Sequence, residues 1–427
     1  MNRRTFVKSV AGAAALGMPA LLGMQPKKYR TALIGSGWWG MNIARMALQS
    51  GEVEMTALCD VDRTIRENAA AEIEKLTGRK PKMYNDYRDL LHEVKPEIAI
   101  VASPDHWHAL QTIDAVKAGA DVYVEKPIGH TIMEGRAMVN AARKYGRIVQ
   151  VGTHRRVSPH NMAAIDFLKK GGAGKIGFIR AFVFSSGGPG EMTPDEDPPD
   201  GLDWDLYCGP APLRPFNRRI HPRGFRQFLD FANGTLGDWG VHWMDHILWW
   251  SEELYPTYVH SAGGKFIAQD NPDAPDTQSV NFQFETFTAV WETRRYGGND
   301  CEKHPLGIYF YGTEGIVHIG WHDGWTFYPA KKSGKLIHED PKLHQPDDQN
   351  IPELWADFMR CIKTRQKPVC DIEILHRSTN MSLLGMLSHK LGRGIRWDGR
   401  AERCPNDDEA NKLLRRAYRA PWIYPEE

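Results

Sequence analysis

The first third of the chain alternates short apolar runs with longer segments of helical periodicity. The apolar, β-rich runs fall at 29–34, 54–58, 97–101, 122–124 and 148–151. The helical patterns lie between them, at 41–48, 63–76, 86–92, 106–118 and 131–144. Strands that alternate with helices of this length are typical of βαβ units, which build a parallel sheet. The pattern therefore predicts a doubly wound α/β domain over residues 29–151.

The rest of the chain has a different pattern. Its β-rich runs follow one another more closely, at 177–184, 280–284, 287–293, 308–311 and 316–321. The residues Gly312-Thr313-Glu314-Gly315 have the character of a tight turn between two of these runs. Helical patterns return at 351–363 and 374–391. These features predict a second, α+β domain over residues 152–427.

A glycine-rich turn joins the first predicted strand to the first helix. It reads Gly35-Ser36-Gly37-Trp38-Trp39-Gly40. In a dinucleotide site the first glycine makes the tight turn, the second lets backbone approach the pyrophosphate, and the third allows helix and strand to pack closely. Asp60 ends the second strand, where an acid binds the adenosine ribose hydroxyls. We therefore expect NAD as cofactor in preference to NADP, although Arg63 nearby keeps NADP open.

Two loops follow later strands of the predicted parallel sheet. One contains Ser103, Pro104 and His108, and the other contains Glu125 and Lys126. Ligands of such sheets bind beyond the carboxyl ends of the strands. We therefore expect both loops to border the cofactor, with Trp38 and Trp39 of the glycine turn. The alternative for Lys126 is a solvated lysine at a strand end.

These motifs together resemble the glucose-fructose oxidoreductase, inositol dehydrogenase and MocA (Gfo/Idh/MocA) family. The resemblance rests on the glycine turn, the segment from Ser103-Pro104 to His108 and above all Glu125-Lys126-Pro127. It implies a Rossmann domain followed by a domain built on a large, mainly antiparallel sheet with an open face, often used for dimers or tetramers. It also implies that C-terminal segments pack back on the Rossmann domain, so a boundary near Val151 is approximate.

A second group of polar residues falls at helical spacing. Asp238, His242 and Asp245 would share one face of a helix. By the family resemblance, Lys126 orients the reacting hydroxyl, His242 exchanges its proton, and Asp238 binds substrate or positions His242.

Two alternatives to this catalytic role remain for the same helix. One is helix capping with a buried, structural histidine. The other is a zinc or manganese site made by Asp238, His242, Asp245 and His246. His246 would lie about 80° around the helix from Asp238 at 100° per residue, so the four converge poorly. We therefore expect no metal ion there, and a structural role for Asp245 and His246.

Four further residues are predicted to contact substrate: His154, Arg156, Trp204 and Arg226. Trp204 and Arg226 are included because their segments resemble ones that close over the nicotinamide side in longer members of the family. The histidine and first arginine follow the last Rossmann strand, where they could instead pair with surface acids. The chain contains 14 Trp, and flat aromatic faces suit sugar rings, although a Trp-rich core is an equal alternative. The acidic loop 195–200 could bind calcium or simply be solvated.

The N-terminus has the features of an export signal. Arg3-Arg4 is followed by a moderately apolar stretch from Ser9 to Met24 that contains no acidic or basic residue between Val10 and Leu22. Residues 1–28 thus resemble a twin-arginine signal, which predicts contact with the twin-arginine export machinery and a periplasmic or exported protein. No clean cleavage site is present, so a retained membrane anchor is open.

Composition excludes several classes of protein. The chain has 427 residues, 41% hydrophobic and 25% charged, which excludes a disordered chain and a multi-pass membrane protein. Its net charge of +1 provides no basic field for nucleic acid. The six cysteines form no C-x-x-C pair, and no disulfide can be assigned.

These observations predict an NAD-dependent enzyme that transfers hydride at a hydroxyl carbon of a sugar, polyol or glycoside. An exported enzyme has no dinucleotide pool to draw on, so we expect the nicotinamide cofactor to be held tightly. One alternative is an NAD-dependent glycoside hydrolase, which works by transient oxidation of a hydroxyl and elimination. The other is a sugar-binding protein that has lost turnover.

Overall fold

The computed structural model describes residues 27–299 and 301–426. The predicted twin-arginine signal therefore lies, apart from its last two residues, outside the described residues. Among the helices that are described, none combines the length and apolar character needed to cross a membrane. The six cysteines all fall within the described ranges and are unpaired.

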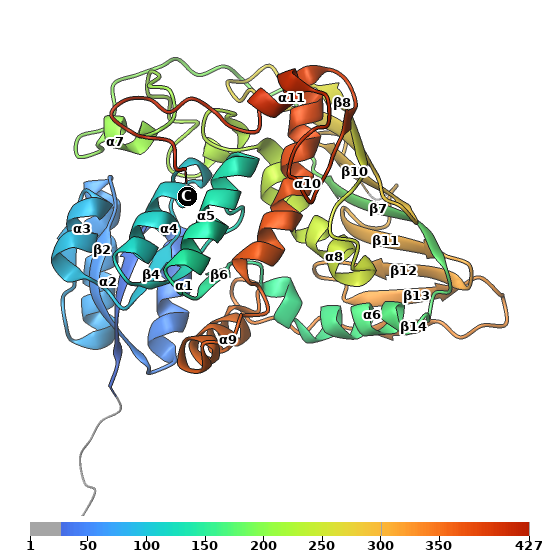
Figure 1. The fold of residues 1–427 in the computed structure, drawn as a ribbon, viewed down its shortest axis with the longest axis horizontal. Coiled ribbons are helices and arrows are strands. Elements are labelled where there is room, and N and C mark those ends of the chain that lie inside the picture. The colour runs from blue at the N-terminus through green and yellow to red at the C-terminus, as the bar shows by residue number, and fades with distance from the viewer. Residues whose placement is uncertain (1–26, 300, 427) are drawn as a thin grey trace, which may run out of the picture.

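The N-terminal domain is a six-stranded parallel sheet with helices packed on it (Figure 1). The strand order is β3-β2-β1-β4-β5-β6, the doubly wound order of a Rossmann fold. Every residue of β4 and β5 is buried, so helices cover both faces of the sheet. The strands are β1 (Tyr29–Ile34), β2 (Val53–Cys59), β3 (Lys82–Tyr84), β4 (Ile98–Val101), β5 (Asp121–Val124) and β6 (Val149–Val151). The helices are α1 (Trp38–Gln49), α2 (Arg63–Thr77), α3 (Tyr87–Val94), α4 (His108–Lys117) and α5 (Ile132–Lys144).

The second domain contains a nine-stranded sheet. Its order is β14-β13-β12-β11-β7-β10-β9-β8-β15, and the pairs are antiparallel except for β7 with β10. The strands are β7 (Ile176–Phe184), β8 (Tyr258–Gly264), β9 (Thr277–Gln283), β10 (Thr288–Arg294), β11 (Leu306–Gly312), β12 (Gly315–Ile319), β13 (Trp325–Pro329), β14 (Ile337–Glu339) and β15 (Ile395–Arg396). The predicted fold class, a Rossmann domain with a mainly antiparallel partner domain, is confirmed.

Helices cover one face of this sheet and leave the other, here called the outer face, without a helical layer (Figure 1). The covering helices are α6 (Pro159–Lys169), α8 (Val241–Ser251) and α10 (Ile372–Leu391). Alternation along β11 shows the two environments: Ile308 and Phe310 are fully buried under the helices, whereas Tyr309 is partly exposed on the outer face. Two short helices complete the domain, α7 (Trp204–Cys208) and α11 (Asp408–Lys412).

C-terminal segments pack back on the Rossmann domain, as the family resemblance implied. Helix α9 (Ile351–Thr364) and the start of α10 contribute Trp355, Phe358 and Leu375 to the core of the first domain. The first domain is therefore completed by residues far along the chain.

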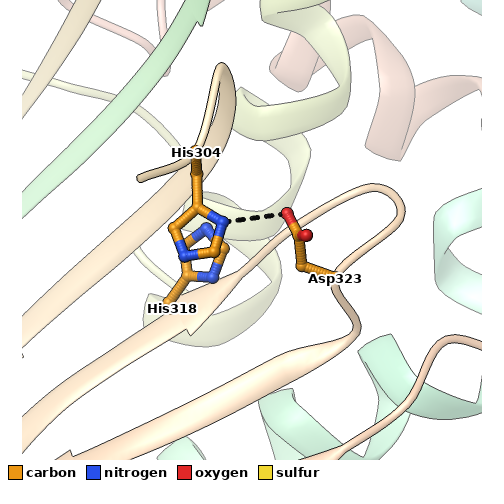
Figure 2. A group of neighbouring side chains, drawn as sticks. All are labelled: His304, His318 and Asp323. Atoms are coloured by element: carbon orange, nitrogen blue, oxygen red, sulfur yellow. Dashed lines mark hydrogen bonds and ion pairs between the residues drawn. The ribbon is translucent and has the colours of Figure 1, made fainter. Parts of the chain in front are cut away.

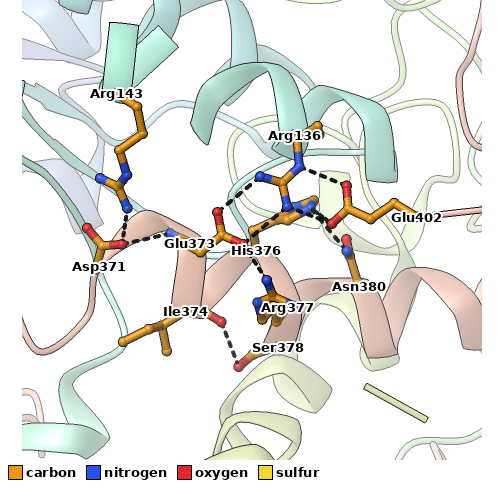
Figure 3. Close-up of polar contacts among 10 residues, drawn as sticks. All are labelled: Arg136, Arg143, Asp371, Glu373, Ile374, His376, Arg377, Ser378, Asn380 and Glu402. Carbon is orange, nitrogen blue, oxygen red and sulfur yellow. Dashed lines mark hydrogen bonds and ion pairs between the residues drawn. The ribbon is translucent and has the colours of Figure 1, made fainter. Parts of the chain in front are cut away.

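Charged groups reinforce this packing (Figure 3). Arg136 on α5 donates to Glu373 on α10 and to Glu402, with N–O distances between 2.7 and 3.2 Å. The buried His376 contacts the same Glu402 at 2.8 Å. These contacts fix α10, which spans both domains, against α5 (Figure 1).

Candidate active site

A cavity of about 680 Å³ lies between the two domains. The glycine turn, the loops after β4 and β5, and segments of the second domain line it. It is thus located beyond the carboxyl ends of the Rossmann strands, where the sequence placed it.

The glycine turn provides the space that a dinucleotide needs. Gly35 has φ of +89°, and a Cβ atom on it would lie 2.5 Å from the backbone nitrogen of Ser103. A Cβ on Gly40 would lie 2.0 Å from the carbonyl oxygen of Gly35. A Cβ on Gly37 would meet nothing within 4 Å, because this residue faces the cavity. The turn therefore leaves open space at the start of α1, where backbone N–H groups bind phosphates.

Asp60 lies at the end of β2 and lines the same cavity. Its Oδ2 accepts from the backbone nitrogen of Ser36 at 2.8 Å, and its Oδ1 accepts from that of Asp62 at 3.1 Å. Burial raises the pKa of Asp60, whereas these two hydrogen bonds act to lower it and only partly offset the effect of burial. The glycine turn thus positions the carboxyl group, which fits the ribose of a dinucleotide.

The other residues predicted to border the cofactor also line the cavity: Trp38, Trp39, Ser103, Pro104, His108, Glu125 and Lys126. Two of them, His108 and Glu125, make contacts that hold the loops after β4 and β5 in place. The ring of His108 contacts the carbonyl oxygens of Pro127 at 2.7 Å and Ser103 at 2.8 Å, so it ties the two loops together. Glu125 is buried and accepts from the backbone nitrogen of Lys126.

Lys126, Asp238 and Arg226 form a charge cluster within the cavity wall. Lys126 Nζ donates to Asp238 Oδ1 at 2.6 Å and to the Asp238 carbonyl oxygen at 3.0 Å. Arg226 Nε donates to the same Oδ1 at 3.2 Å. Burial opposes the ionisation of Asp238, but the two cations outweigh it and hold its pKa below the usual value. The three predicted residues are therefore brought together, with Asp238 ionised.

Asp238 lies in a π-helical turn, Leu236–Gly240, that leads directly into α8. A π-helical turn is wider than an α-helical one and is frequent at functional sites. His242, in the first turn of α8, lines the cavity with Asp238. Burial, with Lys126 and Arg155 as lesser causes, holds the pKa of His242 well below its usual value. The imidazole is therefore neutral at neutral pH and can accept a proton.

Aromatic rings surround His242 on the substrate side. The ring of Trp321 lies 5.2 Å from that of His242 and 5.4 Å from that of His154. Trp239 lies 5.2 Å from the Trp321 ring. These four residues line the cavity, and the buried Arg155 guanidinium lies over Trp321. The cavity thus offers flat aromatic surface beside proton-accepting groups.

Two predicted substrate residues do not reach the cavity. Arg156 forms a bidentate ion pair with Asp245, at 2.8 Å for both N–O contacts, because that buried carboxylate needs a counter-charge. Trp204 is buried in a separate apolar cluster and donates to the carbonyl oxygen of Arg214. It stacks on Tyr207, which does line the cavity. Their predicted substrate contact is therefore withdrawn.

The alternative metal ligands on the α8 segment do not converge. Asp245 contacts Arg156 and Ser378. His246 contacts the carbonyl oxygen of His242 and the side chain of Asn161. Neither Asp245 nor His246 lines the cavity. The acidic loop 195–200 is exposed, as a solvated loop would be.

Sequence reasoning missed one acid of the site. Asp105 follows Pro104 at the end of β4 and is 4% exposed. It lines the cavity, and its Oδ2 is buried without a hydrogen-bond partner. Burial raises its pKa to about 7, in the field of Arg226, Asp238 and Lys126. Its position at a strand end was the signal that could have found it.

Two family models match most of the chain. Residues 29–153 match the model described as "Oxidoreductase family, NAD-binding Rossmann fold" of Gfo/Idh/MocA. Residues 168–259 and 332–424 match the C-terminal alpha/beta domain of an oxidoreductase family, again of Gfo/Idh/MocA. The chain belongs to the Gfo/Idh/MocA oxidoreductase family. The predicted NAD-binding Rossmann domain is thereby confirmed.

Curated relatives of this family member match in part. A glycosyl hydrolase family 109 protein of Akkermansia muciniphila is 35% identical over 112 residues, which cover 25% of this chain and 23% of that protein. Another, of Stenotrophomonas maltophilia, is 28% identical over 214 residues, 45% of this chain and 46% of that protein. The chain therefore spans less than half the length of these relatives.

Solved structures share the whole fold. A levoglucosan dehydrogenase in complex with NADH and levoglucosan has a TM-score of 0.66 at 16% identity, covering 87% of this chain and 99% of that chain. WlbA dehydrogenase from Bordetella pertussis, in complex with NADH and UDP-GlcNAcA, has a TM-score of 0.64 at 18% identity, covering 87% and 99%. A myo-inositol 2-dehydrogenase from Lactobacillus plantarum has 0.62 at 19%, also covering 87% and 99%. At these identities the likeness shows the fold.

Proposed function

We propose that this protein is an NAD-dependent oxidoreductase that transfers hydride at a hydroxyl carbon of a sugar, polyol or glycoside. One observation carries the proposal: the Lys126–Asp238 pair and neutral His242 share one cavity with the glycine turn. Levoglucosan and UDP-GlcNAcA, the compounds bound with NADH in two similar structures, are both sugar derivatives and support this class.

Lys126, His242 and Asp238 have different roles toward the substrate hydroxyl. The Lys126 ammonium group donates a hydrogen bond to the hydroxyl oxygen and stabilises developing negative charge there. His242 accepts the hydroxyl proton in oxidation and returns it in reduction. Asp238 holds Lys126 in place through the 2.6 Å contact. NAD, when bound, supplies the hydride acceptor.

The aromatic wall supports a carbohydrate as the substrate. The rings of Trp239 and Trp321 line the cavity beside His154 and His242. Apolar faces of sugar rings pack on such surfaces, while hydroxyl groups require hydrogen-bonding neighbours. The combination of tryptophans, imidazoles and charged groups in one cavity matches both needs.

Tight retention of NAD is part of the proposal. Segments of the second domain reach across to the ribose side of the cavity. His221 contacts the Asp62 carboxylate at 2.9 Å, and the Arg223 guanidinium lies 4.7 Å from the centre of the exposed Trp38 ring. A dinucleotide in the cavity would be partly enclosed by these contacts, which favours slow exchange.

A test combines bound cofactor, turnover and one variant. We expect denatured protein to release NAD, and sugars or polyols to raise the near-ultraviolet absorbance of reduced nicotinamide. His242→Ala should slow this reduction about 10²-fold or more while NAD stays bound, because general-base catalysis contributes about 10²–10⁴. Wild-type rates in the variant would remove His242 from the mechanism. Failure of every sugar and polyol to react would favour the binding-protein alternative.

Glycoside cleavage is the second candidate, because the curated relatives are named glycosyl hydrolase family 109 proteins. Such a cycle would oxidise a ring hydroxyl, eliminate the glycosidic substituent, add water and reduce the ring again. Aryl glycosides separate the two activities. Aglycone release without net reduction of NAD would establish the cleavage cycle, and reduction without release would establish the dehydrogenase.

Location and assembly complete the proposal. The arginine pair and apolar stretch of the N-terminus support export by the twin-arginine route to the periplasm.

The outer face of the nine-stranded sheet carries Phe178, Tyr309 and Tyr311, which supports a homo-oligomer formed through this face. Fractionation of cells and light scattering of the purified protein test these two points.

A further inference from the structure

Two histidines and an aspartate meet on the second domain, and none of the three lines the active-site cavity (Figure 2). His304 precedes β11, His318 lies on β12, and Asp323 lies in the turn between β12 and β13. His304 Nδ1 contacts Asp323 Oδ2 at 3.0 Å, and the two imidazole rings are stacked with centroids 3.8 Å apart. One potential ligand atom from each residue lies within 4.8 Å of the other two.

This cluster contains buried nitrogens that have no partner. His318 is fully buried, and neither of its ring nitrogens has a hydrogen-bond partner among the described residues. Within the same part of the chain, His304 Nε2 is also buried without a partner. Buried polar groups in proteins are normally satisfied, so a site with three such atoms beside a carboxylate points to a missing ligand.

We propose that His304, His318 and Asp323 bind a divalent cation of the zinc class. Imidazole nitrogens and a carboxylate oxygen are ligands that zinc takes, and three protein ligands leave a fourth position for water. The Asp323 side chain is 43% exposed and gives the ion a route from solvent. The paired imidazoles favour zinc, cobalt or nickel over calcium and magnesium, which prefer oxygen ligands.

The local structure allows the cluster to close on an ion. Zinc bonds of about 2.0–2.1 Å place tetrahedral ligand atoms roughly 3.4 Å apart. The ring planes are 20° apart, so one ring must turn to direct its lone pair at the ion. His304 and Asp323 are carried by loops, which permit this adjustment, whereas His318 is fixed in its strand.

Lys303, the residue before His304, is engaged with a tyrosine and not with Asp323. Lys303 Nζ donates to the hydroxyl of Tyr328 at 2.8 Å and lies over the same ring. Among the described residues, Asp323 forms an ion-pair contact with His304 and with no other basic side chain.

The ion would also act on the active site through one short turn. Residues 320–324 carry Asp323 to the cluster and Trp321 to the cavity, where its ring lies 5.2 Å from that of His242. The turn is closed by a 2.9 Å hydrogen bond from Gly320 N to the Gly324 carbonyl oxygen. A bound ion therefore restrains the segment that positions Trp321.

Cobalt binding tests the proposal directly. Untagged full-length protein is titrated with Co²⁺, and its visible absorbance is followed. We expect one equivalent to bind, and Asp323→Asn, which keeps the shape of the side chain, to weaken binding at least tenfold. The matched control is Asp340→Asn, because Asp340 contacts His338 at 3.1 Å in an exposed pair without a third ligand. This control should bind as the wild type does.

A second measurement does not depend on cobalt spectra. Zn²⁺ should raise the Tm of the wild type and of Asp340→Asn, but not that of Asp323→Asn or His304→Gln, because an ion that binds the folded state stabilises it. The proposal is overturned if the wild type binds no stoichiometric ion. It is equally overturned if both ligand variants retain wild-type affinity. Neither readout requires turnover, so the result is independent of the proposed oxidoreductase activity.

Discussion

The Lys126 ammonium group lies 2.6 Å from Asp238 Oδ1, and this contact joins the two domains. Lys126 follows β5 of the Rossmann sheet, whereas Asp238 belongs to the π-helical turn before α8. Both side chains are largely buried, at 15% and 16% exposure. The pair therefore places an ammonium group, a hydrogen-bond donor, at the point where the domains meet.

Removal of the lysine should separate catalysis from cofactor binding. We expect Lys126→Met to lower kcat at least 10²-fold, because substrate loses its donor and Asp238 keeps only Arg226 as an ion-pair partner. Bound NAD should stay within about twofold of the wild type. The matched control is Lys169→Met, which breaks a surface ion pair with Glu252. Equal rates for Lys126→Met and the wild type would contradict the assignment.

Two glycines of the turn should respond differently to an added side chain. Gly37→Val places its methyl groups in the cavity, where a Cβ meets no atom within 4 Å, so folding should persist while NAD affinity falls at least tenfold. Gly40→Ala should lower the Tm, because its Cβ would lie 2.0 Å from the Gly35 carbonyl oxygen.

Thermal unfolding and fluorescence titration with NADH measure both effects. The control is Gly177→Val, an exposed strand position whose Cβ also meets nothing within 4 Å. It should change neither quantity. NAD affinity unchanged in Gly37→Val would refute the phosphate site.

Asp105 should make stability depend on pH. Its folded pKa of about 7 compares with about 3.9 in an unfolded chain. Between about pH 4 and pH 7 the folded state keeps a proton that the unfolded state has lost, so the free energy of unfolding falls as pH rises. Asparagine does not ionise, so Asp105→Asn removes this decrease in the free energy of unfolding.

We therefore expect the stability of Asp105→Asn, relative to the wild type, to increase by a few kcal/mol from pH 4 to pH 7. Urea unfolding at each pH without added cofactor measures it. Asp166→Asn, at an exposed position, is the control and should run parallel to the wild type. A parallel profile for Asp105→Asn would show that the pKa of Asp105 does not differ between the folded and unfolded states.

Asp60 should determine the choice between NAD and NADP. An acid at this place hydrogen-bonds the ribose hydroxyls and repels a 2′-phosphate. We expect Asp60→Ala to weaken NAD binding about tenfold and to bring the NADP and NAD affinities closer together. Glu67→Ala, an exposed acid on the following helix, should leave both unchanged. Identical affinities for Asp60→Ala and the wild type would refute the ribose contact.

Local sequence patterns were sufficient to predict which residues lie together in the part of the cavity proposed to bind the cofactor. The glycine turn, Asp60, Ser103 and Lys126 each follow a strand of the same parallel sheet. Parallel strands end at one edge, so hydrophobic periodicity alone places these residues together. The same periodicity predicted the boundaries of most Rossmann elements to within a few residues. Strand β3 was not predicted, because its residues Lys82–Tyr84 are largely exposed and form no apolar run.

Only the tertiary structure showed which residues line the part of the cavity proposed to bind the substrate. Sequence placed His154 and Arg156 in one segment, yet His154 lines the cavity while Arg156 turns to the buried carboxylate of Asp245. Trp321 reaches His242 from a turn of the distant sheet, which no local pattern indicates. The spacing of apolar residues shows which face of a helix or strand is buried, because backbone geometry fixes which residues share a face. Which distant side chains then meet depends on how the two domains pack, and buried charges find their partners only in that packing.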